Sequence, residues 1–312
     1  MNSFLKKNVF LVLVICFMIF SFAFPEPGLY IKKIGLLSVF TFIAMFISGL
    51  SLSLENVTGS FKNYKIIIFS ACTSFVIFPA VSYLLGKVFF TNTYDAFVGA
   101  AIISTQATTV TSAIVLTMAA NANVPLAIII TVINNFTSAF LSPVLLKIVL
   151  SMDKGIEFDV LGMILNLFMV LVVPIVLAQL CKLFLKGFVS FISPWRKKIA
   201  NFVVLMFVLI GSSNAAAEVM KSMKLLVLVL IFSAVLHMLL LLVCYVFSKA
   251  ARVSKENLPP LLFCSSQKTM TTSTMIWGNY FSQYTVAPIV IVIYHLVQLV
   301  IDTYIAGRLN KD

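Results

Sequence analysis

The sequence predicts an all-α membrane protein of ten transmembrane helices, arranged as two five-helix repeats of opposite orientation. Three observations support this fold class. The 312 residues are 61% hydrophobic and only 10% charged, with a mean hydropathy of +1.10, whereas soluble domains carry about 25% charged residues. Apolar runs of about 20 residues, long enough to cross a bilayer, recur along the chain. A polar string inside one such run also returns half a chain later inside another.

The apolar runs define the predicted spans, and Pro and Gly separate several of them. The first run follows Lys6 and Lys7 and could instead be a cleavable signal peptide. We expect it to be retained, because its loss would break the repeat symmetry. The two repeats are then residues 1–150 and 151–312. The ten spans lie at about 9–24, 34–53, 66–86, 94–120, 124–147, 160–181, 199–217, 225–248, 258–280 and 284–306.

The positive charge of the predicted loops orients the spans. With ten spans both termini lie on one side, where the loops hold fourteen Lys and Arg residues against seven on the other side. Cytoplasmic loops are enriched in Lys and Arg, so both termini are expected in the cytoplasm and the protein in the plasma (inner) membrane. The net charge of +12 therefore needs no nucleic-acid partner. Lys268 alone belongs to no loop, because it lies inside the ninth span.

Two similar polar strings lie in the fourth and ninth predicted spans. They are STQATTVTS at Ser104–Ser112 and SSQKTMTTS at Ser265–Ser273, identical at five of nine positions with a constant offset of 161 residues. Spans that are five apart run in opposite directions, so the offset predicts halves related by a two-fold axis in the membrane plane. Chance similarity between two Ser/Thr-rich strings is the alternative.

Matching polar strings in inverted repeats indicate a substrate site near the middle of the bilayer. Lipid satisfies no backbone group, so an unwound stretch persists only where it faces protein or a water-filled cavity. Its free N–H and C=O groups can then bind ions and solutes, together with Ser and Thr hydroxyls. Neither string contains Gly or Pro, so the predicted interruption of each helix is inferred from polarity alone.

With these strings, the chain resembles the bile acid:sodium symporter family, and most closely its SBF-like branch. The resemblance covers nearly the whole chain and is strongest in Thr108–Leu146 and in Phe263–Thr269, FCSSQKT. Lys268 matches a lysine that this branch carries. The resemblance implies that spans 4 and 9 are broken helices crossing at the midplane. It also implies that a core of spans 3–5 and 8–10 moves against a panel of spans 1, 2, 6 and 7.

The resemblance also implies a degraded sodium site. Sodium-coupled members have an asparagine and a serine as sodium ligands where this chain has Ala113 and Ala127. They also have a glutamate, which two sodium ions share, where this chain has Phe263. Loss of a carboxylate next to an added cation, Lys268, disfavours sodium at short range. Coupling to Na⁺ is therefore doubtful, and coupling to H⁺ stays open. The residues that would remain as sodium ligands are Ser112, Thr131 and Gln267.

Lys268 is the least expected residue of the ninth span, because a charge inside the membrane is costly and usually functional. It could attract an anionic substrate, stand in for a bound cation or release its proton during transport. A structural lysine that ties helices together is the alternative. Asp302 is the obvious partner by charge. Its expected place near the cytoplasmic end of the tenth span, however, argues against a direct pair.

The two histidines receive different predictions. His295 lies near the middle of the tenth span, and the 161-residue offset matches it with Asn134. It is either an interhelical hydrogen-bond donor or part of the cavity lining. His237 has no evident polar neighbours, so we expect it to be structural.

A membrane enzyme is a less favoured class. The sequence lacks a Gly-x-Ser-x-Gly elbow, and no predicted span contains the clustered carboxylates that would hold Mg²⁺. The five cysteines have neither metal-site nor disulfide spacing. We therefore expect no enzyme and no cofactor. A carrier of another inverted-repeat family, such as an auxin-efflux-type carrier, and a channel or sensor are the alternatives.

Together, these observations predict a secondary active transporter of a small organic anion or amphipathic solute that works by alternating access. Its partners are the lipid bilayer and that solute, and either a monomer or a dimer is compatible with the sequence. The side chains expected to bind the substrate or ion are Gln106, Thr108, Thr109, Ser112, Thr131, Asn134, Asn135, Ser265, Ser266, Gln267, Lys268, Thr269 and His295.

Overall fold

The computed structural model describes residues 9–53, 58–152 and 156–310, and every regular element in these ranges is helical. The predicted all-α class is therefore confirmed for this part of the chain. Some of the lysines counted for the orientation lie outside the described residues: Lys6, Lys7, Lys154 and Lys311.

The helices alternate with short connections along the chain. The first half contains α2 (Val9–Ala23), α3 (Glu26–Lys33), α4 (Leu37–Ser51), η1 (Thr58–Asn63), α5 (Tyr64–Cys72), η2 (Thr73–Ile77), α6 (Phe78–Phe89), α7 (Tyr94–Thr105), α8 (Val110–Ala119) and α9 (Val124–Ser151). The second half contains α10 (Val160–Leu167), η3 (Phe168–Val172), α11 (Val173–Phe184), α12 (Lys186–Ile192), η4 (Ser193–Trp195), α13 (Arg196–Lys221), α14 (Met223–Ala250), α15 (Leu258–Ser266), α16 (Met270–Tyr280) and α17 (Ala287–Leu309).

Several of these helices can cross a membrane. Within the described ranges, six continuous segments are long and apolar enough, and the number rises to eight if two bent pairs each form one span. The bent pairs are α2 with α3, at 92°, and α7 with α8, at 64°. The predicted spans 34–53 and 258–280 correspond to α4, which has 15 residues, and to the interrupted pair α15–α16. The total of ten spans stays a prediction.

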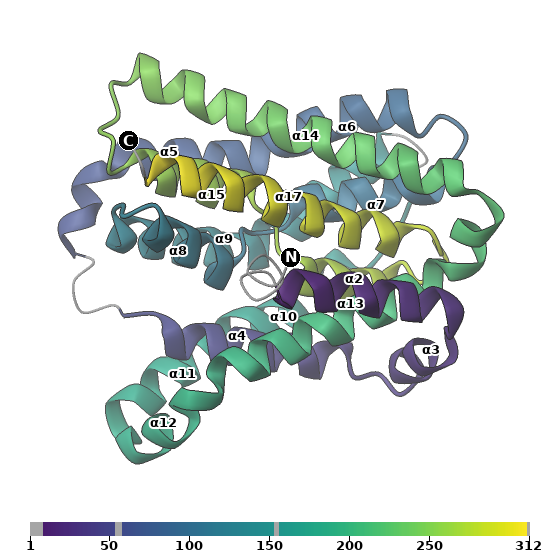
Figure 1. Ribbon diagram of the computed structural model, residues 1–312, viewed down its shortest axis with the longest axis horizontal. Coiled ribbons are helices and arrows are strands. Elements are labelled where there is room, and N and C mark those ends of the chain that lie inside the picture. Colours follow the sequence, from purple (N-terminus) through teal and green to yellow (C-terminus); the bar gives the residue numbers. More distant parts are fainter. Residues whose placement is uncertain (1–8, 54–57, 153–155, 311–312) are drawn as a thin grey trace.

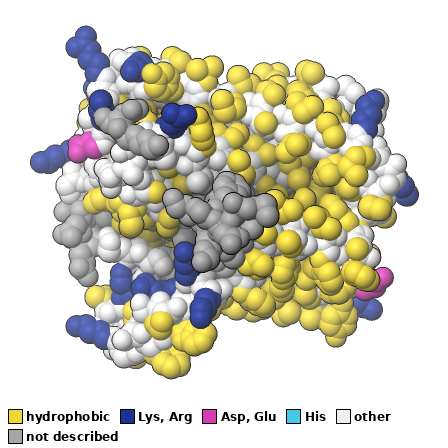
Figure 2. Space-filling model, in the orientation of Figure 1, with side chains coloured by type: hydrophobic (Ala, Val, Ile, Leu, Met, Phe, Trp, Pro, Cys, Tyr) yellow, Lys and Arg dark blue, Asp and Glu magenta, His cyan; other side chains and the backbone are white. Residues whose placement is uncertain are grey.

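The helices form two neighbouring groups (Figure 1). In one group, α13 packs on α2, α3 and α4, and α4 packs on α11. In the other, α17 packs on α7, α14 and α16, while α9 packs on α7, α8 and α15. The groups meet where α13 contacts α17 and where α16 contacts α4. Many hydrophobic side chains lie on the outer surface (Figure 2), as expected for a surface that faces lipid.

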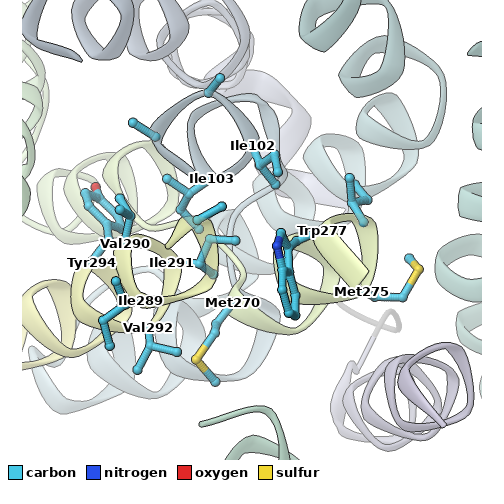
Figure 3. Packing of buried hydrophobic residues seen from close by; sticks show 14 of the residues in the cluster. Ile102, Ile103, Met270, Met275, Trp277, Ile289, Val290, Ile291, Val292 and Tyr294 are labelled. Atoms are coloured by element: carbon cyan, nitrogen blue, oxygen red, sulfur yellow. The ribbon is translucent and has the colours of Figure 1, made fainter. Parts of the chain in front are cut away.

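A buried apolar cluster surrounds the N-terminal half of α17 (Figure 3). Ile102 and Ile103 of α7 and Trp277 of α16 pack there against α17, and all three are fully buried. The close approach of α7 to α17 depends on Gly99, because a Cβ at this position would lie 2.4 Å from the carbonyl oxygen of Ala287. This packing holds α17 beside the two interrupted helices.

Candidate functional site at the crossing of two interrupted helices

Both polar strings contain a break in a helix. The first interruption, residues 106–109, separates α7 from α8, and the second interruption, residues 267–269, separates α15 from α16. Each helix is followed by a glutamine with an extended backbone, Gln106 at ψ 167° and Gln267 at ψ 149°. These two glutamines are an identical pair at the 161-residue offset. The chain thus leaves the helix at equivalent positions of the two strings.

Hydroxyl groups at the end of α7 donate to carbonyl groups of its last turns. The hydroxyl of Ser104 donates to Ala101 O at 2.9 Å, and that of Thr105 donates to Ile102 O at 3.1 Å. Ser and Thr can compete with the helical hydrogen-bond pattern in this way. The Ser/Thr content of the string therefore lets the helix end without Gly or Pro.

The two interruptions are in direct contact. The amide of Thr269 donates to Ala107 O at 3.0 Å, which joins the two unwound backbones. The hydroxyls of Thr109 and Ser112 both donate to Gln267 Oε1, at 2.5 and 2.8 Å. In addition, α8 packs on α15 and α7 packs on α16. The broken helices therefore cross, and their polar strings form one cluster.

Lys268 lies at the centre of this crossing and is fully buried. Its ammonium donates to Gln106 O at 2.6 Å and to Ser74 O at 2.7 Å, and it lies 4.5 Å from the ring centroid of Phe78. The peptide groups of Lys268 are held by Gln298 of α17, which accepts from the amide at 2.8 Å and donates to the carbonyl at 2.9 Å. The unwound backbone is thus satisfied by a side chain, as a buried peptide group requires.

Asp302 lies beside the crossing and pairs with His237 instead of Lys268. Its Oδ1 lies 2.9 Å from His237 Nε2, and its Oδ2 accepts from Gln267 Nε2 at 2.7 Å. His237 Nδ1 lies 3.0 Å from the hydroxyl of Tyr294, which donates to Ser266 O at 2.9 Å. The expectation that His237 has no polar neighbours is therefore wrong. Its partners come from α17, which the pattern of its own span could not reveal.

Two asparagines of α9 tie the strings to the rest of the protein. Asn134 donates to Ser74 Oγ at 3.3 Å and to Cys264 O at 3.4 Å. Asn135 donates to Thr108 O in the first interruption at 3.2 Å. Thr131, in contrast, turns its hydroxyl to Ile128 O of its own helix, at 2.9 Å. Of the suggested sodium ligands, Ser112 and Gln267 therefore meet, and Thr131 does not join them through its hydroxyl.

The remaining predicted side chains also lie in or beside the cluster. The hydroxyl of Ser266 donates to Leu262 O at 2.8 Å, that of Thr269 contacts Thr271 Oγ1 at 3.0 Å, and His295 Nδ1 contacts Gln298 Nε2 at 2.9 Å. Of the thirteen predicted residues, eleven are buried, and only Thr109 and Ser112 are partly exposed. Among these thirteen residues, four buried side-chain oxygens have no hydrogen-bond partner: Gln106 Oε1, Thr108 Oγ1, Asn135 Oδ1 and Ser265 Oγ.

An apolar pocket of about 260 Å³ lies next to Asn135, between α9 and the segment η3–α11. Its polar members are Asn135 and Gln179. The hydrogen bond from Asn135 to Thr108 O connects this pocket to the first interruption. Within the described part of the chain, no three His, Cys, Asp or Glu side chains are grouped to hold a metal ion. The arrangement thus offers hydrogen bonds, one buried cation and an apolar wall.

Five residues of the cluster are absent from the sequence-based site, namely Ser74, His237, Tyr294, Gln298 and Asp302. The last three lie on one face of α17 together with His295, at the spacing of three and four residues that marks one face of a helix. That spacing was a signal in the sequence for a polar face on this helix. Ser74 and His237 give no comparable signal, because neither belongs to a polar stripe that repeats along its own helix.

Comparison with known proteins identifies the family. Residues 8–311 match the SBF-like CPA transporter family. Sodium/bile acid cotransporter 7 of Danio rerio is 24% identical over 97% of this chain and 96% of its own length. The probable chloroplastic sodium/metabolite cotransporter BASS4 of Arabidopsis thaliana is 24% identical over 93% of this chain and 70% of its own length. This is a family of transporters, which confirms that the protein is not an enzyme. The chain therefore belongs to the SBF-like CPA transporter family, as its polar strings indicated.

Proposed function

We propose that the protein is a secondary active transporter that carries a small organic anion or amphipathic solute by alternating access. One observation carries the proposal: two helix interruptions, 161 residues apart, meet in the interior and gather Thr109, Ser112, Gln267 and Lys268 in one cluster. In carriers built from inverted repeats, such interruptions form the solute site at the midplane. The names of these two relatives describe cotransport of sodium with a bile acid or a metabolite.

The charges at the crossing favour an anionic group on the solute. The N-termini of α8 and α16 both begin at the crossing, and the N-terminus of a helix carries a positive partial charge. The negative C-terminus of α7 is already neutralised, because Gln106 O accepts from Lys268. The pocket beside Asn135 supports an amphipathic solute as the alternative substrate, since its apolar walls could hold the hydrocarbon part of such a molecule.

The proposed architecture has ten spans in two inverted repeats, residues 1–150 and 151–312. The panel would consist of α2, α4, α10–α11 and α13, and the core of α5–α9 and α14–α17. The packing of α13 on α2 and α4, and of α17 on α7, α14 and α16, supports this division. The bias of Lys and Arg in the loops supports cytoplasmic termini in the plasma (inner) membrane.

We further propose that sodium dependence is weak or absent. Phe263, which takes the position of the shared glutamate, is fully buried among apolar neighbours. It offers no oxygen to a cation. Coupling to H⁺ or transport without a coupling ion are the remaining modes.

A transport assay on reconstituted protein tests the proposal. Purified protein is first screened by thermal shift with organic anions, with and without Na⁺ and across pH, and the best solute is then used for uptake. Gln267→Ala removes the acceptor of two hydroxyls and the donor to Asp302. Because each such hydrogen bond contributes about 1 kcal/mol, uptake should fall by about tenfold or more, and Lys268→Ala should also lower it.

Exposed residues of the same types provide matched controls, Gln283→Ala and Lys224→Ala. Both control variants should transport at the wild-type rate. If Gln267→Ala and Lys268→Ala both took up the solute at the wild-type rate, the solute site would not lie at the crossing. If the protein bound no solute and conducted ions through an open pore, it would be a channel and not a transporter.

A further inference from the structure

The contact between Lys268 and Ser74 O depends on a local defect in the third predicted span. In η2, a π-helical turn, the amide of Phe78 donates to Thr73 O, five residues back. Ser74 O therefore loses its usual donor, which is the amide of Phe78. The next donor in the π-helical register would be residue 79, which is Pro79 and has no N–H. Ser74 O is left without a donor from its own helix and accepts from the ammonium of Lys268 at 2.7 Å.

The second carbonyl is released by the break after α7. Gln106 O would accept from residue 110 in a continuous helix, but residues 106–109 are not helical. It accepts from Lys268 at 2.6 Å instead. The two carbonyls come from different spans, and the ammonium reaches them from a third. The ring of Phe78 covers the ammonium, with its centroid 4.5 Å away.

These surroundings resemble those of a bound monovalent cation more than those of an ion pair. Backbone carbonyl oxygens replace the hydration shell of alkali ions in proteins, and an aromatic face attracts a cation of either kind. In the described part of the chain, both hydrogen bonds of the ammonium go to main-chain carbonyls, and the buried carboxylate of Asp302 pairs with His237. An ammonium that is held in this way is not directed at a solute.

We propose that Lys268 is a tethered cation, whose ammonium permanently fills a carbonyl-lined site for a monovalent inorganic cation. The wild-type protein then has no room for Na⁺ or K⁺ at this point. Removal of the side chain leaves Ser74 O and Gln106 O, together with space for water, as a site that such a cation can enter. If the protein is a transporter, solute transport needs no inorganic cation at this site, and this consequence rests on the proposed function. The cation site itself does not depend on the proposed function.

Thermal unfolding of the purified protein tests the site without any solute. Lys268→Ala is compared with wild type in NaCl, KCl, methylammonium chloride and choline chloride at equal ionic strength. We expect the variant to unfold at a lower temperature in choline, with a saturable upward shift in Na⁺ or K⁺ and in methylammonium, which replaces the missing ammonium. Wild type should respond equally to all four salts, because its site is filled.

Two further variants separate this proposal from a lysine that merely ties helices together. Lys268→Met fills the space without a charge, so it should be less stable than wild type and should not respond to Na⁺ or methylammonium. Pro79→Ala in the Lys268→Ala protein restores an N–H that competes for Ser74 O, and it should raise the half-saturating cation concentration by about tenfold. If Lys268→Ala cannot be purified without a cation, purification in methylammonium is the expected rescue.

Equal responses of Lys268→Ala and wild type to all four salts would overturn the proposal. If Pro79→Ala left the half-saturating cation concentration unchanged, Ser74 O would not bind the cation, and the proposed carbonyl-lined site would be wrong. These results are independent of the proposed function, because an absence of solute transport in wild type would refute the carrier and leave the cation titration intact. If both proposals hold, uptake by Lys268→Ala should recover in Na⁺ or K⁺ relative to choline.

Discussion

At the scale of single residues, Gln298 is as important to the crossing as the polar strings themselves. An unwound backbone inside a membrane protein needs a partner for each of its peptide groups. Gln298 supplies both partners for Lys268, since its amide side chain accepts from the N–H and donates to the C=O. It thus satisfies both main-chain groups of Lys268 within the second interruption.

Gln298→Leu should therefore destabilise the protein. The substitution leaves two buried peptide groups without partners, and each costs about 1–3 kcal/mol. We expect a clear fall in the midpoint of thermal unfolding of the detergent-purified protein. Thr303→Ala, at an exposed position of the same helix, is the control and should unfold with wild type. A wild-type midpoint for Gln298→Leu would mean that Gln298 does not support the break.

At the scale of elements, His237, Tyr294 and Asp302 connect α14 and α17 to the end of α15. The hydroxyl of Tyr294 donates its hydrogen to Ser266 O, so it must accept one from His237 Nδ1. One further proton then lies between His237 Nε2 and Asp302. Through Asp302, this network joins Gln267 of the second interruption to α14, a helix outside the crossing.

Asp302→Asn and Asp302→Ala should differ strongly in stability. An asparagine can accept from Gln267 and donate to a neutral His237, so every hydrogen bond of the network keeps a partner. Alanine leaves Gln267 Nε2 and His237 Nε2 buried without a partner, and each unsatisfied buried group costs about 1–3 kcal/mol. Thermal unfolding should show a small shift for Asn and a large one for Ala. Equal shifts for the two variants would contradict the network.

At the scale of the whole molecule, few polar contacts join the two helix groups near the first interruption. Ser48 of α4 and Thr111 of α8 form one of them, with 3.1 Å between their hydroxyl oxygens. At the opposite end of the broken helices, Asn279 of α16 donates to Ser38 of α4 at 3.1 Å. Motion of one group against the other must break such contacts, because α4 and the broken helices lie in different groups.

A disulfide between positions 48 and 111 should therefore stop transport. Ser48→Cys/Thr111→Cys would place two sulfur atoms where the hydroxyls now touch, within reach of a bridge. The exposed or partly exposed Cys16, Cys72 and Cys181 are replaced by Ala first. We expect oxidation to abolish solute uptake and reduction to restore it, while each single variant stays active. Full uptake by the oxidised double variant would exclude relative motion of α4 and α8.

The sequence alone determined the class of the protein and the regions of the two interruptions. Composition and the length of the apolar runs required a multi-pass membrane protein, because such surface is stable only in lipid. The paired polar strings marked the segments in which the helices break, since Ser and Thr side chains compete locally with the helical hydrogen bonds. These properties depend on residues that are close together in the chain, so they can be read from the sequence alone.

Only the tertiary structure decided what the charged residues do. By charge, Asp302 was the obvious partner of Lys268, yet the lysine binds Ser74 O, 194 residues away, and Asp302 pairs with His237. The reason is that a buried ammonium needs hydrogen-bond acceptors, and Ser74 O has no donor from its own helix. The missing N–H of Pro79 creates that acceptor, and the packing of three spans brings it within reach. The sequence contains Pro79, but only the folded chain brings Lys268 to Ser74 O.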